Sequence, residues 1–400
     1  MAAPPPTALP QGLASLEAQP PPKPASWRER WRAFRTRTIA RPGFQRWAAG
    51  FPLTRGIARA NTKALFDLCA GFVYSQTLFA CVRLDLFRLL AEGPLAPDAV
   101  AARVGLALDR AERLLKAATA LDLLTRLPDG RFALSDLGAA LLGNPSVAAM
   151  IEHHALLYAD LADPVALLRG EGGPTKLSRY WAYAEAARGD PASAVAVAPY
   201  GALMGASQEL IAGDILDAYP LRDHRRILDV GGGEGAFLKA AARHAPGLGL
   251  MLFDLPAVAA RAERAFVEAG LNGRTETFGG AFPEDPLPHG ADIVSLVRVV
   301  HDHDDGKVRA LLRAIHAALP AGGTLLIAEP MAGTPGAEAM ADAYFGFYLL
   351  AMGTGRCRTA AELADLLAET GFGRVREVTT RRPLLTRLLV STRLDTHDCK

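Results

Sequence analysis

A histidine and two carboxylates follow strand-like runs in the second half of the chain. The run Asp292–Val300 leads into His301 and Asp302, and the run Gly323–Ala328 leads into Glu329. Ligands of open α/β sheets bind at the carboxyl ends of the strands, which is where these side chains would lie. A histidine of ordinary pKa, ~6.5, can act as a general base near neutral pH, and a carboxylate on one ring nitrogen would fix its tautomer. A structural histidine at a strand end is the alternative.

A glycine-rich turn precedes these residues. The segment Arg226–Phe237 reads RILDVGGGEGAF, and it predicts a short buried strand, a tight turn and a helix from Ala236 to His244. Glycines at the turn would let the backbone approach a ligand closely. A dinucleotide fingerprint needs its last glycine one residue later, at Ala236, which the relaxed form of that motif accepts. The glycines alone therefore leave two kinds of adenosine cofactor open. The motif residues are Asp229, Gly231, Gly233 and Gly235.

A second acid lies about 20 residues beyond the turn, at a spacing that suits ribose hydroxyls. The apolar run Leu248–Phe253 predicts another strand, and Asp254 follows it directly, before Leu255 and Pro256. Asp254 can also be interpreted as the N-cap of a helix that begins at Pro256, and both interpretations can hold together.

Composition limits the classes of protein that fit. The chain has 400 residues, of which 50% are hydrophobic, and a formal net charge of +2, so it predicts two domains and no general attraction to nucleic acid. No apolar signal core or stretch long enough to span a bilayer is evident, which predicts a soluble or peripheral protein. The cysteines show no metal spacing, which favours a reducing cytoplasm. They are Cys69, Cys81, Cys357 and Cys399.

The N-terminal 60 residues fall into two parts. Residues 1–25 are rich in Pro and Ala and predict a disordered lead. Residues 26–60 form a basic extension in which Trp27, Trp31 and Phe34 share one face of a predicted helix surrounded by arginines. Such a helix could lie on an anionic membrane surface or dock its aromatic face on the protein's own core, and the pattern favours neither.

Residues 61–190 predict a helical domain that ends in a winged helix. We expect a buried helix or helix pair over Asn61–Leu90, then helices with aspartate starts at Asp98–Val104 and Asp109–Leu124. Leu124–Leu127 and Arg131–Leu134 predict a small hairpin. A winged helix often binds DNA. The basic face here is too small to favour that function, because it consists of Arg110, Arg113 and Lys116 alone.

Three ordered motifs resemble those of S-adenosylmethionine-dependent O-methyltransferases with a winged-helix dimerisation domain. They are the glycine segment, Phe253-Asp254-Leu255-Pro256, and Arg298-Val299-Val300-His301-Asp302. The resemblance extends from about residue 65 to residue 390. It implies an α/β fold, with a Rossmann-like class I methyltransferase sheet over residues 191–400, S-adenosylmethionine as cofactor and a homodimer formed through the helical domain.

The resemblance also implies roles for individual residues. It makes His301 the general base and places Glu329 against it, while Asp302 stands beside the base and is expected to cap a helix that begins around Asp304 or Asp305. The implied cofactor-binding residues are Asp229, Gly231, Gly233, Gly235, Asp254, Leu255, Gly280, Ala281, Phe282 and Arg298. The implied acceptor-binding residues, for which core packing is an equally good interpretation, are Tyr180, Trp181, Tyr200 and Met204.

A narrower resemblance concerns the acceptor. Phe44–Trp47 and Ala64–Leu84 are similar to the carotenoid O-methyltransferases of purple phototrophic bacteria, which act on 1-hydroxy carotenoids of the spheroidene pathway. Two positions depart from the wider family. Gly280 replaces an aspartate that frames the adenine, and Cys357 replaces a glutamate beside the base.

Other functions remain open at this point. They are O-methylation of a phenolic or polyketide small molecule, a different reaction on the same cofactor, a winged-helix regulator without chemistry, and a nicotinamide dehydrogenase. The last would need a Ser/Tyr/Lys or Cys/His catalytic set after the glycine turn, and none is evident in the sequence.

Overall fold

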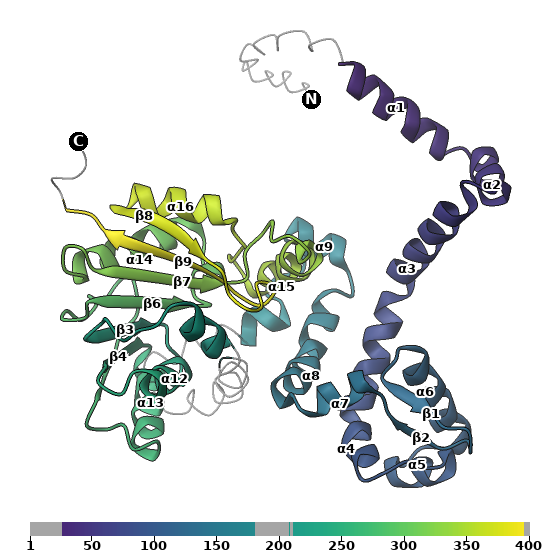
Figure 1. Ribbon diagram of the computed structural model, residues 1–400, viewed down its shortest axis with the longest axis horizontal. Helices are drawn as coiled ribbons and strands as arrows, with labels where there is room; N and C mark the ends of the chain where they lie inside the picture. Colours follow the sequence, from purple (N-terminus) through teal and green to yellow (C-terminus); the bar gives the residue numbers. More distant parts are fainter. Residues whose placement is uncertain (1–25, 181–207, 209–210, 396–400) are drawn as a thin grey trace, which may run out of the picture. The chain divides into compact units, whose positions relative to one another are not determined.

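The computed structural model describes residues 26–180, 208 and 211–395 (Figure 1). Contacts within the chain divide it into two compact units, residues 1–76 and residues 77–400. The domain boundaries predicted from the sequence, at residues 25, 60 and 190, stay predictions.

The first unit contains two short helices and most of a long one. Helix α1 (Trp27–Ile39) begins at a capping box formed by Ser26 and Glu29, and it buries no side chain. Helix α2 (Pro42–Gly50) follows, and α3 (Arg55–Arg83) runs on into the second unit. The predicted helix from residue 26 is thus confirmed, with its aromatic face exposed in this chain.

The prediction of a buried helix over Asn61–Leu90 is wrong for α3. Among the residues of this helix only Cys81 is buried, and large apolar side chains lie in solvent along its length. No element of the described chain covers this apolar face of α3. The hydrophobicity of the helix therefore predicted burial that the single chain does not provide. The exposed side chains are Ile57, Leu65, Phe66, Leu68, Phe72 and Val73.

Helix α3 also corrects the expectation that no segment could span a bilayer. It is long and apolar enough by length and composition, with a mean hydropathy of 1.5 in its best window. The sequence interpretation missed this helix because polar residues interrupt the apolar run. The mean hydropathy of the segment nevertheless stays high enough for a membrane span. The core helix of a soluble protein meets the same criteria of length and composition.

The second unit begins with the predicted winged helix. Helices α5 and α6 and the hairpin are confirmed, but the aspartate starts are not, because the N-cap residues are Ala96 and Ala107 and make no side-chain cap. Asp98 and Asp109 lie in the first turns instead. The elements are α4 (Leu86–Ala91), α5 (Pro97–Val104), α6 (Leu108–Ala120), β1 (Leu124–Arg126), β2 (Phe132–Leu134) and α7 (Asp136–Leu142).

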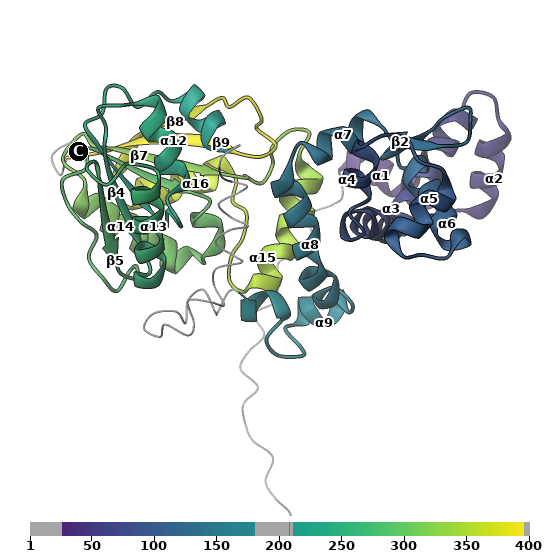
Figure 2. The ribbon, with the colours of Figure 1, turned by 90° about the horizontal axis from the view of Figure 1, so that it is seen from below.

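Three helices join this part of the unit to the sheet. Helix α8 (Pro145–Asp160) lies beside α15 (Phe345–Met352), which is preceded by a π-helical turn, η2 (Ala339–Tyr344) (Figure 2). Helix α9 (Pro164–Arg169) ends at its C-cap, Gly170, which has a left-handed backbone. Two histidine–tyrosine hydrogen bonds fasten α8 to the η2–α15 segment, which is continuous with the sheet.

A seven-stranded sheet forms the C-terminal part, in the order β5-β4-β3-β6-β7-β9-β8 (Figure 1). The first five strands along the chain are parallel, and β9 is antiparallel to both of its neighbours. The predicted α/β fold with an open sheet is confirmed, and the sheet has an antiparallel edge. The strands are β3 (Arg226–Val230), β4 (Gly249–Asp254), β5 (Thr275–Gly279), β6 (Ile293–Val297), β7 (Thr324–Glu329), β8 (Phe372–Val378) and β9 (Arg387–Arg393).

Helices cover both faces of the sheet, and each face has its own hydrophobic core. One core joins strand side chains to α12 and α13, and the other joins them to α14 and α16. The central strands β3 and β6 are buried on both sides and consist mainly of branched apolar residues, as is typical of parallel strands. The helices are α12 (Ala236–His244), α13 (Pro256–Glu268), α14 (Asp305–Ala318) and α16 (Ala360–Glu369).

Strand β6 is shorter than the predicted run Asp292–Val300. It ends at Val297 rather than Val300, because Arg298 adopts a left-handed backbone with φ of 58° and turns the chain. The next residues form a single turn of 3-10 helix, η1 (Val300–Asp302). His301 and Asp302 therefore lie on a turn beyond the strand.

Candidate active site

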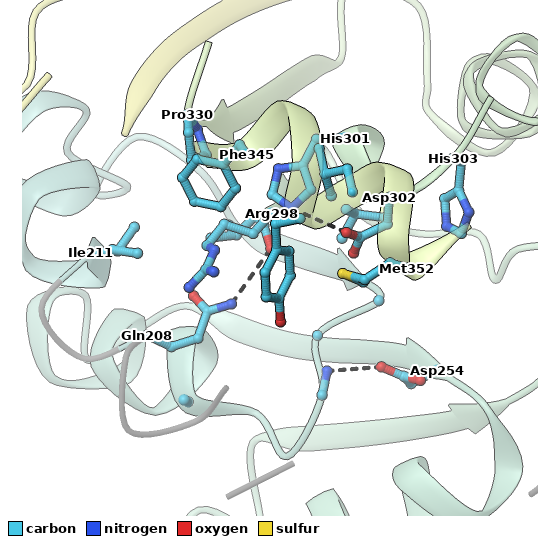
Figure 3. Close-up of a pocket in the computed structure, with 18 of the residues that line it drawn as sticks. Gln208, Ile211, Asp254, Arg298, His301, Asp302, His303, Pro330, Phe345 and Met352 are labelled. Carbon is cyan, nitrogen blue, oxygen red and sulfur yellow. Dashed lines mark hydrogen bonds and ion pairs between the residues drawn. The ribbon is translucent and has the colours of Figure 1, made fainter. Parts of the chain in front are cut away.

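A cavity of about 450 Å³ opens at the carboxyl ends of the parallel strands. Its walls come from the turns after β3, β4, β5 and β6 and from the helices α8 and α15, which are far apart in the sequence. This is the edge at which the sequence predicted ligand binding. Figure 3 shows Asp254, Arg298, His301 and Asp302 gathered around it.

The glycine turn forms the floor of this cavity. Gly231, Gly233 and Gly235 all have positive φ, which favours glycine over other residues. Gly235 has a second requirement, because a Cβ there would overlap the ring of Phe266. Gly233 faces open space, so its backbone is accessible to a ligand.

Asp254 ties the turn to the next strand. Its Oδ2 accepts a hydrogen bond of 2.8 Å from the backbone N–H of Gly233, and its Oδ1 accepts one of 2.7 Å from Leu255. The N-cap of α13 is Leu255, so the N-cap interpretation of Asp254 is wrong. Burial raises the pKa of Asp254 to about 6, against the lowering effect of its two backbone donors. Each oxygen keeps a lone pair for a further donor.

Asp229 lies at the end of β3, fully buried. Its Oδ1 accepts a hydrogen bond of 2.6 Å from Ser295, whereas its Oδ2 has no partner among the described residues. Burial raises the pKa of Asp229 to about 7, and the nearby carboxylate of Asp254 adds to this rise. Asp229, predicted to bind the cofactor, is not among the residues that line the cavity, and its Oδ2 lies close to Gly232 of the turn.

The departure at Gly280 has a steric explanation. A Cβ at this position would lie 2.7 Å from the ring of Phe253, so a side chain of the neighbouring strand β4 occupies the space that a family aspartate would need. Asp285 supplies a carboxylate nearby, whose Oδ2 accepts a hydrogen bond of 2.9 Å from the N–H of Ala281. Gly280, Ala281 and Phe282 all line the cavity.

Glu329 holds the turn that carries His301. Its Oε1 accepts hydrogen bonds from three consecutive backbone N–H groups, at 3.1 Å from Val299, 2.5 Å from Val300 and 3.2 Å from His301. Glu329 is buried at the end of β7, and burial raises its pKa, although these donors and the imidazole oppose the rise. The carboxylate thus fixes the backbone of the turn as well as facing the imidazole.

The imidazole of His301 lies between two carboxylates. Its Nε2 is 3.2 Å from Oδ1 of Asp302, and its Nδ1 is 3.8 Å from Oε2 of Glu329, beyond hydrogen-bond distance. Burial alone would lower the pKa of His301, but these carboxylates outweigh burial and raise it above its ordinary value. The expectation that Asp302 caps the next helix is wrong, because Asp304 caps α14 by accepting from Lys307.

Two histidine–tyrosine pairs join α8 to the η2–α15 segment, and His154, Tyr344 and Tyr348 of these pairs line the cavity. His154 is 2.7 Å from the hydroxyl of Tyr344, and His153 is 2.9 Å from that of Tyr348. Burial lowers the pKa of His154 to about 4 and raises that of Tyr344 to about 12, so both are neutral at physiological pH. The sequence analysis missed these residues. The adjacent histidines of α8 were the only signal, and their partners lie about 190 residues away.

The predicted acceptor residues fare differently. Tyr180 packs on the ring of His153, 5.2 Å between centroids, and does not line the cavity. Trp181, Tyr200 and Met204 lie outside the described residues. Apolar side chains that were not predicted, among them Met150, Phe345 and Met352, form the walls of the cavity instead.

Cys357 lies near the carboxylates without taking the place of a charged one. Burial raises the pKa of its thiol to about 12, and the negative charge of Glu329 contributes. The thiol is therefore neutral. The carboxylate of Asp302, on the turn itself, is the second acid that touches the imidazole in this chain.

Family models match most of the described chain. An O-methyltransferase domain matches residues 158–373, and an O-methyltransferase dimerisation domain matches residues 66–144. A demethylspheroidene O-methyltransferase of Cereibacter sphaeroides is 47% identical over 88% of this chain and 92% of its own length. One of Rhodobacter capsulatus is 41% identical over 86% and 85%.

More distant relatives share the architecture. Acetylserotonin O-methyltransferase of Rattus norvegicus is 34% identical over 83% of this chain and 77% of its own. The structure of human N-acetylserotonin methyltransferase in complex with S-adenosylmethionine matches with a TM-score of 0.68 and 26% identity, covering 84% and 98% of the two chains. The structure of a mitomycin 7-O-methyltransferase matches with a TM-score of 0.71 and 26% identity, covering 85% and 99%.

Proposed function

This chain belongs to the family of S-adenosylmethionine-dependent O-methyltransferases, and we propose that its methyl acceptor is the tertiary hydroxyl of a 1-hydroxy carotenoid. The enzyme class, the cofactor and the predicted class I fold with an N-terminal dimerisation domain follow from the two family models. The dimerisation domain supports a homodimer. The observation that carries the acceptor proposal is the similarity, along 88% of the chain, to a relative named for demethylspheroidene.

The residues at the cavity fit the cofactor. The open backbone at Gly233 and the carboxylate of Asp254 offer an accessible surface and a hydrogen-bond acceptor for an adenosyl amino acid. Asp229 does not line the cavity and supports the end of β3 through its hydrogen bond with Ser295. Gly231, Gly235 and Leu255 shape the turn and the strand end. Gly280, Ala281, Phe282 and Arg298 complete the lining on this side. When bound, S-adenosylmethionine supplies a methyl group on a sulfonium, which is already a strong electrophile.

His301 is the general base in this proposal. An alcohol is a poor nucleophile while protonated, and a tertiary alcohol is far less acidic than a phenol, so removal of its proton matters more. The imidazole lines the cavity and can take that proton only in its neutral form. Alignment of the reacting atoms contributes about 7–11 kcal/mol in well-oriented systems, and the apolar walls formed by α8 and α15 would provide it.

Asp302 and Glu329 share the task of orienting the base. Asp302 contacts Nε2 and Glu329 faces Nδ1, so either carboxylate can stabilise the imidazolium that forms when the proton is taken. Both carboxylates remain beside the imidazole in this chain, although Cys357 replaces the family glutamate.

A labelling experiment tests the acceptor and the base together. The protein is incubated with methyl-labelled S-adenosylmethionine and a panel of 1-hydroxy carotenoids, phenols and polyketide alcohols. We expect label in the hydroxycarotenoids, and a kcat for His301→Ala at least about tenfold lower with nearly unchanged cofactor affinity. Label in a phenol alone would overturn the acceptor proposal. Full turnover in His301→Ala would mean that alignment suffices.

We further propose that the enzyme lies peripherally on the cytoplasmic face of the photosynthetic membrane, where an apolar acceptor would be held. The support is in α1, whose Trp27, Trp31 and Phe34 are more than half exposed within a segment rich in arginine. Aromatic residues on one face and basic residues around them are typical of helices that lie in the membrane interface.

Deletion of residues 1–50 tests this contact. The truncated protein should sediment less with liposomes of anionic lipid than the full chain, because it lacks the aromatic side chains and most of the arginines. A matched variant with Trp27, Trp31 and Phe34 changed to Ser keeps the charge and separates the two contributions. Equal sedimentation of the full and truncated chains would contradict the proposal.

A further inference from the structure

We infer that Arg358 is a positioning residue for the general base, because its buried guanidinium holds the carbonyl side of the same turn whose N–H side is held by Glu329. The residue lies between α15 and α16, more than 50 positions after the turn, and only 2% of it is exposed. The inference rests on the proposed role of His301.

The contacts of Arg358 span the whole turn. One terminal nitrogen, Nη1, donates a hydrogen bond of 3.0 Å to the carbonyl of Val300, and Nη2 donates one of 2.8 Å to the carbonyl of His303. These carbonyls lie on either side of His301 and Asp302. The guanidinium also donates from Nε and Nη2 to Oδ1 of Asp305, at 2.9 and 2.6 Å. The planar fork of arginine suits such a set of acceptors, whereas a lysine ammonium cannot reach them all.

The two sides of the turn are thus fixed by opposite charges. Glu329 accepts from the N–H groups of Val299, Val300 and His301, and Arg358 donates to carbonyls of Val300 and His303. A buried arginine is unfavourable unless its donors are paired, and here the backbone of the catalytic turn supplies two of its acceptors. The turn cannot shift without breaking bonds to one of these charges.

Close packing supports the same conclusion. Gly355, three residues before Arg358, lies so near the turn that a Cβ there would overlap the carbonyl oxygen of His301. The carbonyl of Arg358 in turn accepts a hydrogen bond of 3.0 Å from Ala332, beyond β7. The segment from Gly355 to Arg358 is therefore held between the end of β7 and the turn.

Arg356 provides a matched control within the same segment. It also pairs with Asp305, at 3.1 Å, and with Glu362, at 2.8 Å, but its side chain is 44% exposed and makes no contact with the turn's carbonyls. A change at Arg356 therefore removes a guanidinium beside Asp305 but keeps the hydrogen bonds from Arg358 to the carbonyls of the turn.

The experiment compares Arg358→Lys with Arg356→Gln in the full chain. We expect Arg358→Lys to lose about 10²-fold in kcat, the cost of a small misplacement of a catalytic group, with cofactor affinity unchanged. Arg356→Gln should stay near wild type. Wild-type kcat in Arg358→Lys, or an equal loss in both variants, would overturn the inference.

A readout that does not depend on turnover separates this inference from the proposed function. Titration of His301 by NMR, assigned with His301→Asn, should show its pKa falling toward the ordinary value in Arg358→Lys and unchanged in Arg356→Gln. Lysine keeps the charge, so the fall reports a changed distance to Asp302 and Glu329. If His301→Ala keeps turnover, the proposed base role of His301 is disproved. The titration then still shows whether Arg358 positions the imidazole.

Gly355→Ala is a second way to displace the turn, in case Arg358→Lys does not fold. It leaves both charges in place and should lower kcat and the pKa of His301 in the same direction. A folded Gly355→Ala protein with wild-type values of both would overturn the inference. Loss of folding in both variants would assign the segment to stability rather than to positioning and would overturn it as well.

Discussion

The N-terminal extension and the turn that carries His301 both contain charged residues, but their surroundings are opposite. Residues 26–60 carry nine arginines and a single acid, Glu29, and among the described residues of the first unit only Ala48 is buried. At the turn, His301, Glu329 and Arg358 are all buried, each beside an opposite charge or a backbone dipole.

This difference teaches what each set of charges can do. Arginines in water remain free to meet an external partner, but their interactions are screened by salt. Charges buried at the turn are already committed to internal partners, and their removal leaves other buried groups unsatisfied. The first region therefore offers attraction to a surface, and the second offers fixed geometry.

Glu329 should show the largest effect of a single change at the turn. In Glu329→Ala three buried N–H groups lose their acceptor and the imidazole loses a carboxylate, so we expect kcat to fall by at least about 10²-fold. The free energy of unfolding should also fall, by about 1–3 kcal/mol for each group left unsatisfied. Steady-state kinetics and thermal unfolding measure the two effects.

Glu329→Gln is the matched control, because its amide oxygen can still accept from the N–H groups while the charge is lost. It should keep most of the stability and lose activity. If the Ala and Gln variants were equally stable, the backbone role of Glu329 would be disproved.

The sequence predicted this region well where strand and turn patterns are local. The glycine turn, the strand ends and the edge that gathers His301, Glu329 and Asp254 follow from apolar runs and from the rule that parallel strands present their carboxyl ends together. The sequence analysis interpreted Cys357 but not its neighbour Arg358. The buried contacts of Arg358 depend on side-chain geometry across more than 50 residues, which no local pattern contains.

The acceptor side was harder to predict. His154 and Tyr344 come from helices whose periodicity indicates packing but not which helix packs against which. The exposed face of α3 shows the same limit, since an apolar stripe predicts burial without naming the partner that buries it. The role of Asp302 was wrong because two acceptable caps, Asp302 and Asp304, lie two residues apart.

Asp302 should have a smaller effect, visible in the pH profile. The carboxylates raise the pKa of His301, and the base form exists only above that pKa, so kcat should rise with pH through a value higher than that of an ordinary histidine. Asp302→Asn removes one raising charge, so the acid limb of the profile should move to lower pH. Rates at constant cofactor saturation across the pH range measure it. A limb that stays in place or moves to higher pH would contradict the arrangement.

Salt concentration should distinguish the two regions without any change to the protein. Between 0.1 and 1 M salt the screening length falls from about 10 Å to about 3 Å, so attraction between the exposed arginines and an anionic surface should be largely lost. The kcat on a detergent-dispersed acceptor should hardly change, because buried charges such as those of His301 and Glu329 are screened far less. Co-sedimentation with anionic and with neutral vesicles, run beside kcat at each salt concentration, measures both. Binding that survives 1 M salt equally on both kinds of vesicle would assign the membrane contact to the aromatic face alone. A loss of kcat over the same salt range would show that the turn is less enclosed than its contacts indicate.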